Sequence, residues 1–215
     1  PIQNIGAYGM EVKDSIVKVE GVDMMKNERA EFSNDECEFA YRNSVFKRQM
    51  KNTFFITHVT FRLQKPPHKL VTHYSNIAEE LEKQPKQNIA AIRKIVRKIR
   101  RSKLPDVNVT GNAGSFFKNP VVRREFAYKL KSKYSDMPVF DMDKDHVKLS
   151  AAWLIDKSEL KGFRKGNTGT HINQPLVIVN HGNATGDELF DLAARIIGII
   201  KNKFGIELEP EVNVI

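Results

Sequence analysis

Apolar and polar positions alternate in two stretches of the first third of the chain, as they do in strands covered on one face. The first stretch lies within residues 12–24 and contains Val12, Ile16, Val17, Val19 and Val22. The second runs from Phe54 to Leu63 and places Phe55, Val59, Phe61 and Leu63 on one face, with His58, Thr60 and Arg62 on the other. Both are predicted strands, and Pro66-Pro67 ends the second.

Helical spacing replaces this alternation further along the chain. Residues 87–101 carry Ile89, Ile92, Ile95, Val96 and Ile99 on one face of a predicted helix that Leu104-Pro105-Asp106 ends. We expect further helices at 76–83, 119–134, 151–160 and 185–204, the last ended by Gly205, and strands at 146–149, 175–180 and 209–215. Interspersed helices and strands predict an α+β fold with a domain boundary near Lys103–Asp106.

Composition fits a globular chain with a sizeable core. The 215 residues are 40% apolar and 28% charged. No apolar run is long enough to span a bilayer and no signal pattern opens the chain, so we expect a cytoplasmic protein without a membrane partner. The single cysteine, Cys37, lies between two glutamates, which disfavours a thiolate and predicts a bystander thiol. Because the chain begins with Pro1, we expect a fragment or a processed product.

The net charge of +9 comes mainly from one segment. Eight cations without an acid among them lie at Lys86, Arg93, Lys94, Arg97, Lys98, Arg100, Arg101 and Lys103, and the remaining chain has 27 basic and 26 acidic residues. A nucleic-acid-binding module is therefore one hypothesis. This segment has no aromatic side chain on which bases could stack, so only non-specific attraction to phosphates would remain. We expect no specific nucleic-acid partner.

Candidate chemistry gathers in segments rich in glycine and amides. Asp141 to His146 resembles the start of a calcium loop, but His146 replaces the required glycine and Ala152 the final glutamate, so we expect no metal site. The segment GNAGSFFKNP, residues 111–120, combines two glycines with Ser115, which allows a close backbone approach to a ligand. The opening segment PIQNIGAYG, residues 1–9, likewise contains two glycines and two amide side chains.

Together these segments resemble the UDP-N-acetylenolpyruvoylglucosamine reductase family, also called UDP-N-acetylmuramate dehydrogenases. The resemblance rests on ordered motifs over the whole chain: PIQNIGAYG at 1–9, FAYRNSVFK at 39–47, KLPD at 103–106, GNAGSFFKNP at 111–120, LSAAWLID at 149–156, KG at 161–162, QPLVIVN at 174–180 and LEPEV at 208–212. It implies the later part of an FAD-binding domain at 1–104, followed by a smaller α+β substrate-binding domain at 105–215 with a C-terminal return strand.

The resemblance also implies a reaction and its residues. NADPH would reduce FAD, which in turn would reduce UDP-N-acetylglucosamine enolpyruvate to UDP-N-acetylmuramate in peptidoglycan synthesis, and so serve cell wall biogenesis, cell shape, the cell cycle and cell division. Ser115 matches the family's proton donor, and Arg42 and Glu211 match its other catalytic residues. Flavin contacts carry over to Ile2, Gly6 and Arg100, and substrate contacts to Tyr8, Tyr74, Lys103, Asn119 and Gln174. Tyr74, in THYSNI, fits the subtype that closes a tyrosine-bearing loop over substrate. We expect a monomer.

The chain departs from the family pattern at three places. KLPDV replaces KLPDP, and Phe140 replaces a tyrosine that contacts substrate in some members. The N-terminal lobe with its glycine-rich flavin turn is not in this sequence. A catalytically silent UDP-sugar-binding fragment is therefore the alternative to an active flavoprotein oxidoreductase, and the sequence leaves both open.

Overall fold

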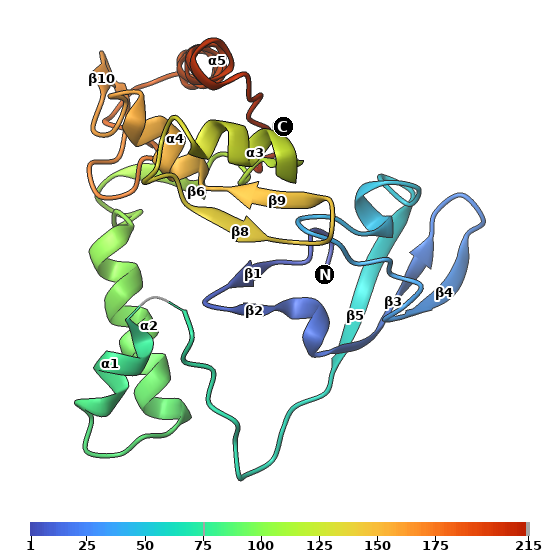
Figure 1. The fold of residues 1–215 in the computed structure, drawn as a ribbon. Helices are drawn as coiled ribbons and strands as arrows, with labels where there is room; N and C mark the ends of the chain where they lie inside the picture. Colours follow the sequence, from blue (N-terminus) through green and yellow to red (C-terminus); the bar gives the residue numbers. More distant parts are fainter. Residues whose placement is uncertain (75, 214–215) are drawn as a thin grey trace. The chain divides into compact units, whose positions relative to one another are not determined.

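A computed structural model of the chain describes residues 1–74 and 76–213 (Figure 1). The chain divides into two compact units, Pro1–Lys98 and Ile99–Ile215. Helices alternate with sheets whose neighbouring strands are all antiparallel, which confirms the predicted α+β class. Within the described part of the chain, no helix combines the length and apolar character that a membrane crossing needs.

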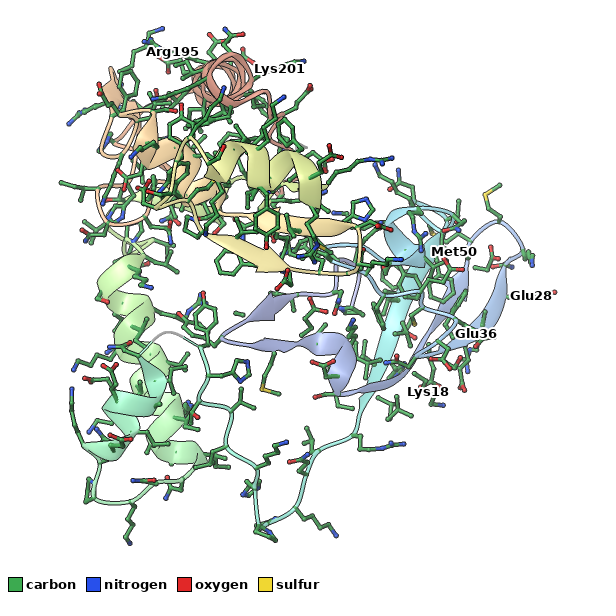
Figure 2. The ribbon with its side chains drawn as sticks, in the orientation of Figure 1. Lys18, Glu28, Glu36, Met50, Arg195 and Lys201 are labelled. Carbon is green, nitrogen blue, oxygen red and sulfur yellow. The ribbon has the colours of Figure 1, made fainter. Side chains whose placement is uncertain are left out.

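The first unit is built on a three-stranded sheet with β3 (Ile16–Asp23) between β4 (Glu28–Ser33) and β5 (Phe54–Phe61). Two short strands, β1 (Gly6–Ala7) and β2 (Met10–Glu11), pair before it, and 3-10 turns occupy Val12–Asp14 and Val45–Lys47. Its small core contains Ile16, Val19, Cys37, Val45 and Phe46. Met50, labelled in Figure 2, packs against this core.

The sequence correctly located these two long strands but misjudged their details. The first strand begins at Ile16 because Val12–Asp14 forms a 3-10 turn. The predicted inner face of β5 was wrong at Phe55 and Phe61, which are 63% and 47% exposed. The register shifts between Glu20 and Gly21, and the ring of Phe54 lies over Gly21, so Phe54 rather than Phe55 packs against the core. Leu63, also predicted inside, lies beyond the strand and is exposed.

Two helices follow this sheet. The first, α1 (Ile77–Glu82), and the second, α2 (Ile89–Lys103), agree with the predicted segments. Ile95 and Ile99 of α2 are buried, while its cations are exposed. Lys98 pairs with Glu80 at 3.2 Å, which is the one ion pair that the described residues give to the cations of α2.

The second unit contains two sheets. One has the order β10 (Arg164–Lys165), β11 (Thr168–Thr170), β12 (Val177–Asn180) and β6 (Gly111–Ser115). The other places β9 (His146–Leu149) between β7 (Val121–Arg123) and β8 (Val139–Asp141). Helices α3 (Arg124–Lys131), α4 (Ala151–Lys157) and α5 (Gly186–Phe204) complete the unit.

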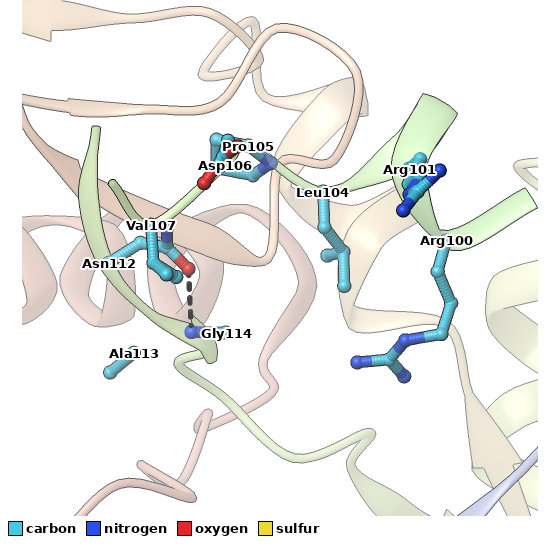
Figure 3. Close-up of a pocket in the computed structure, with 9 residues that line it drawn as sticks. All are labelled: Arg100, Arg101, Leu104, Pro105, Asp106, Val107, Asn112, Ala113 and Gly114. Carbon is cyan, nitrogen blue, oxygen red and sulfur yellow. Dashed lines mark hydrogen bonds between the residues drawn. The ribbon is translucent and has the colours of Figure 1, made fainter. Parts of the chain in front are cut away.

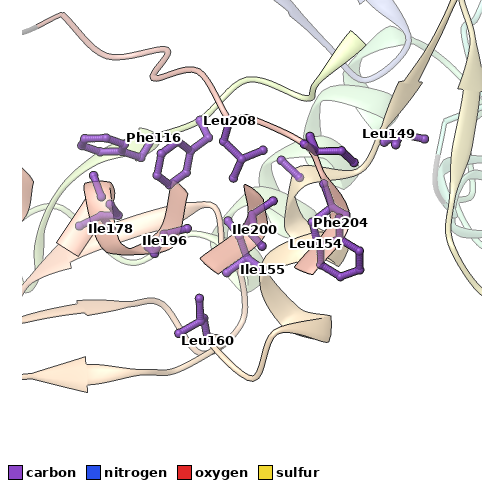
Figure 4. Packing of buried hydrophobic residues seen from close by; sticks show 14 of the residues in the cluster. Phe116, Leu149, Leu154, Ile155, Leu160, Ile178, Ile196, Ile200, Phe204 and Leu208 are labelled. Atoms are coloured by element: carbon purple, nitrogen blue, oxygen red, sulfur yellow. The ribbon is translucent and has the colours of Figure 1, made fainter. Parts of the chain in front are cut away.

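The core of the second unit forms around α5 (Figure 4). Ile196, Ile200 and Phe204 lie on its buried face, with Leu154 and Ile155 of α4 in the same cluster. Burial of each such side chain stabilises the fold by about 1.5–3 kcal/mol. Thr185 and Glu188 form a capping box at the start of α5. Gly205 ends the helix at φ 70°, as the sequence predicted.

Three boundaries in this unit differ from their predictions. The helix expected from residue 119 begins at Arg124, because Val121–Arg123 pairs with β9 instead. Helix α4 ends at Lys157, short of residue 160, because Ser158 and Glu159 turn back with bonds to Ile155 and Asp156. The strand expected at 209–215 reduces, in its described part, to one bridge between Phe117 and Pro210, and residues 214–215 lie outside the described residues.

Candidate functional site

Ser115 ends strand β6, in the segment that the sequence singled out for its glycines. This segment forms a strand paired with β12, and Ser115 lies opposite Val177 and is exposed. The next amide, of Phe116, donates to the carbonyl of Leu176 at 2.7 Å. The serine is therefore held at the end of an edge strand of the four-stranded sheet.

Glu211 and Gln174 lie on segments bonded to the same strand pair. The Glu211 amide donates to the Phe116 carbonyl at 2.7 Å, and the Lys118 amide donates to the Glu209 carbonyl at 2.9 Å. The Gln174 carbonyl accepts from the amide of Val177, the residue opposite Ser115, at 3.0 Å. Three predicted site residues far apart in sequence are thus brought onto adjoining segments of the second unit.

An open cleft with a volume of about 810 Å³ lies beside β6 (Figure 3). Its lining consists of Arg100, Arg101, Leu104, Pro105, Asp106, Val107, Asn112, Ala113 and Gly114. Arg100 was predicted as a cofactor contact. Lys103, predicted as a substrate contact, is the last residue of α2 and is exposed. Two guanidinium groups beside a glycine-containing backbone suit a ligand that carries phosphates.

Asn119 has a structural role that the sequence did not reveal. Its side-chain oxygen accepts from the amide of Ala151, the first residue of α4, at 3.0 Å. Ser150 accepts from the Trp153 amide in the same first turn. The predicted substrate contact therefore also caps a helix, so its loss would disturb the fold as well as any ligand.

The first unit holds the remaining predicted residues, and three of them lie together. Arg42 donates to the Gly6 carbonyl at 2.9 Å, and its guanidinium lies over the Tyr41 ring at 5.3 Å. The carbonyl of Ile2 accepts from the hydroxyl of Ser44, which is buried. Residues 1–6 are thus fastened to the 39–47 segment.

Asn4, which the sequence left unassigned, stabilises this arrangement. It is fully buried at φ 45°, and its amide donates to Glu11 at 2.9 Å and to the Ala40 carbonyl at 3.0 Å. An asparagine between Gln3 and Ile5, two positions before a glycine, was the available signal, since asparagine tolerates positive φ better than most residues.

Tyr8 and Tyr74 meet edge to face with ring centroids 5.4 Å apart. Tyr74 is 45% exposed. Next to them, a Cβ placed on Gly9, at φ 80°, would come within 2.6 Å of the His73 ring. The segment that carries Tyr74 therefore packs against the opening segment, and Tyr8 is half-buried there.

Two further positions that the sequence analysis discussed are Phe140 and the loop from Asp141 to His146. Phe140 lies on β8 opposite Lys148 and is 49% exposed. In the rejected calcium loop, Asp143 accepts from the amides of Asp145 and His146, each at 2.8 Å, and these bonds lower the pKa of the Asp143 carboxyl. Within residues 1–74 and 76–213, no group of three His, Cys, Asp or Glu side chains is arranged to hold a metal.

Comparison with known proteins gives consistent matches. The family model described as UDP-N-acetylenolpyruvoylglucosamine reductase, C-terminal domain, matches residues 105–215. Proteins named UDP-N-acetylenolpyruvoylglucosamine reductase are similar over nearly all of this chain: the one from Flavobacterium johnsoniae is 42% identical over 100% of the chain, and the one from Chromobacterium violaceum is 46% identical over 98%. The chain spans 64% and 62% of their respective lengths.

A solved structure is also similar. The crystal structure of UDP-N-acetylenolpyruvylglucosamine reductase from Thermus caldophilus matches 99% of this chain and 57% of its own, with a TM-score of 0.63. The sequences are 22% identical in this match, so the likeness concerns the fold.

Proposed function

The chain belongs to the UDP-N-acetylenolpyruvoylglucosamine reductase family, and from this membership we propose that its protein reduces UDP-N-acetylglucosamine enolpyruvate to UDP-N-acetylmuramate. NADPH is the reductant and FAD the cofactor of this proposal, which makes the protein a cytoplasmic, monomeric flavoprotein of peptidoglycan precursor synthesis. The observation that carries it is the bonded arrangement of Ser115, Gln174 and Glu211 at the β6–β12 pair, close in sequence to a cleft lined by arginines.

Reduction of the enolpyruvyl double bond needs a hydride at C3 and a proton at C2. A bound flavin that NADPH has reduced would supply the hydride. Ser115 then gives its hydroxyl proton to C2 and recovers one from water. A hydroxyl is a weak acid, so a cation must favour the loss of its proton, a role that suits Lys103 and, by the family resemblance, Arg42. Glu211 assists proton delivery or polarises the substrate carboxylate.

The first unit offers residues that fit a flavin. A Cβ on Gly6 would lie 3.0 Å from the Glu11 side chain and 3.3 Å from the Arg42 guanidinium, so glycine lets these two side chains pack against the backbone of the opening segment. Ile2 and Gly6 would contact the cofactor, and Arg100 would meet an anionic part of it. Tyr8, Tyr74, Lys103, Asn119 and Gln174 would hold the UDP-sugar.

The alternative is that these 215 residues alone bind the UDP-sugar without turnover. It is favoured by one observation, that the matched relatives are longer than this chain. Expressed by themselves, residues 1–215 are expected to lose FAD during desalting, because a flavin diphosphate is held by several backbone amides and helix termini. A stoichiometric flavin absorption band after desalting would overturn this expectation.

The proposed activity is tested on the full-length protein from the same gene. NADPH oxidation should depend on added UDP-N-acetylglucosamine enolpyruvate, and mass spectrometry should find the product heavier by one pair of hydrogens. UDP-N-acetylglucosamine, which has no enolpyruvyl group, is the matched control substrate. Oxidation of NADPH at the same rate with either sugar nucleotide, or no reduced product, would refute the proposal.

A further inference from the structure

Strand β6 contains an irregularity directly before Ser115. Val179 of β12 pairs with Asn112, so a regular antiparallel ladder would place Gly114 opposite Val177. Ser115 occupies that position instead, which means that β6 carries one extra residue between the two pairs. Such a bulge changes the direction of the side chain that follows it.

The bulge depends on a backbone conformation that glycine allows. Gly114 lies at φ 74°, and a Cβ built on it would meet no atom within 4 Å. The need for glycine is therefore conformational and not a matter of space. A bulge built on a permissive residue needs something else to fix it, since a shift of register by one residue would turn Ser115 to the other face of the sheet.

The side chain of Asn112 supplies that restraint. Its oxygen accepts from the Gly114 amide at 3.0 Å, and its nitrogen donates to the Thr110 carbonyl at 2.9 Å. One carboxamide thus joins the backbone before the bulge to the backbone within it. Figure 3 draws the bond between Asn112 and Gly114. The Phe116 amide, bonded to Leu176, fixes the chain after the bulge.

We infer that Asn112 is a positioning residue, which acts on the reaction by holding the β6 bulge that aims the Ser115 hydroxyl. This inference rests on the proposed function, in which Ser115 gives the proton to C2. Asn112 itself transfers no proton, and its effect reaches the substrate through the orientation of the serine. A displacement of about 1 Å in a reacting group can cost on the order of 100-fold in rate.

The geometry is tested first, by amide hydrogen exchange of the full-length protein. In Asn112→Ala the Gly114 amide loses its acceptor and should exchange faster, whereas Asn112→Asp keeps a side-chain oxygen there and should protect it. The Phe116 amide is the internal control and should stay protected in both. Unchanged protection of Gly114 in the alanine variant would overturn the inference.

The consequence for the reaction is tested by measuring the two half-reactions separately. Asn112→Ala should slow the step that consumes the enolpyruvyl substrate by about 10- to 100-fold and leave the NADPH-dependent step unchanged. Asn112→Asp should recover most of the rate. In the Ser115→Ala background the Asn112→Ala change should slow the reaction no further, because both changes remove the same interaction.

These measurements separate the inference from the proposed function. If Ser115→Ala leaves the substrate step unchanged, the proposed role of Ser115 is wrong, and the inference falls with it. If Ser115→Ala slows that step but Asn112→Ala does not, or the two effects multiply, the inference alone is wrong. Should Asn112→Ala fail to fold, Asn112→Asp replaces it: a modest slowing that disappears in the Ser115→Ala background supports the inference, and one that persists refutes it.

Discussion

The backbone amide of Glu211 donates a hydrogen bond to the carbonyl of Phe116 at 2.7 Å, which fixes the C-terminal segment beside the residue that follows Ser115. Lys118 and Glu209 continue this contact through their backbones at 2.9 Å and their side chains at 2.6 Å. Two residues proposed to act on the same substrate are thereby linked through main-chain bonds, which surface substitutions cannot easily break.

Glu209→Ala should consequently change stability little. The Glu209 side chain is 72% exposed, and exposed ion pairs contribute about 0–1 kcal/mol. The main-chain bonds remain in the variant. Urea denaturation would measure the effect, with Glu207→Ala, which breaks a comparable pair with Lys201, as the control. A loss above about 2 kcal/mol for Glu209→Ala alone would mean that the side-chain pair, and not the backbone, holds the segment.

Substitution by alanine should change stability in opposite directions at two glycines, one inside α5 and one directly after its end. Gly198 lies inside the helix with no atom within 4 Å of a built Cβ, so Gly198→Ala should stabilise the protein by about 0.5–1 kcal/mol. Gly205 caps the helix at φ 70°, where a side chain is strained, so Gly205→Ala should destabilise it by about 1–2 kcal/mol. Thermal unfolding would rank the two variants, and the reverse order would contradict the described end of α5.

Sequence alone was sufficient where local chemistry determines structure. Thr185, Glu188 and Gly205 define both ends of α5 through bonds within a few residues, and the isoleucine spacing defines α2. Prediction from the sequence failed where pairing between distant segments determines which face of a strand is buried. Phe55 looked inward from alternation, but the register shift between Glu20 and Gly21 reverses the face at Phe54–Ile56, and no pattern within β5 reports it.

In the candidate site too, local sequence identified residues, whereas pairing between distant segments determined their structural roles. Ser115 was identified from its motif, yet the strand, its bulge and the bridging role of Asn112 depend on pairing with β12, more than sixty positions later. Asn119 was expected at a ligand, and its bond to Ala151 became visible only when α4 was placed. Residue types that suit a ligand also suit backbone capping, and sequence does not separate the two uses.

Cys37 should be unreactive near neutral pH. Its side chain is fully buried, and burial, with a smaller contribution from Glu36, raises the pKa of the thiol to about 11 from an ordinary value of 9.0. A thiol reagent should therefore label it at the rate of unfolding. The folded thiol binds its proton more tightly than the unfolded one, so its contribution to stability falls as pH rises from about 9 to about 11. Cys37→Ser should remove that part of the slope, and fast labelling of the folded protein would contradict the buried position.

Lys103→Ala in the full-length protein should weaken binding of the UDP-sugar. Loss of a charge-assisted hydrogen bond to a phosphate costs about 1.5–3 kcal/mol. Arg93→Ala, on the same helix and also exposed, is the matched control and should change affinity much less. Calorimetry at two salt concentrations would compare them, since general attraction by the basic helix weakens with salt. Equal effects of both substitutions would show that α2 acts only through its total charge.

Stopped-flow measurement of both half-reactions in full-length Ser115→Ala tests the proposed proton donor most directly. Flavin reduction by NADPH requires no proton at the substrate C2, so its rate should stay close to that of the unmodified protein. The substrate-dependent step should slow by about 10²- to 10⁴-fold, equivalent to roughly 3–5 kcal/mol of barrier, as expected when a general acid is lost. If both steps slow equally, or neither slows, Ser115 is not the proton donor and the proposed use of the β6–β12 site is wrong.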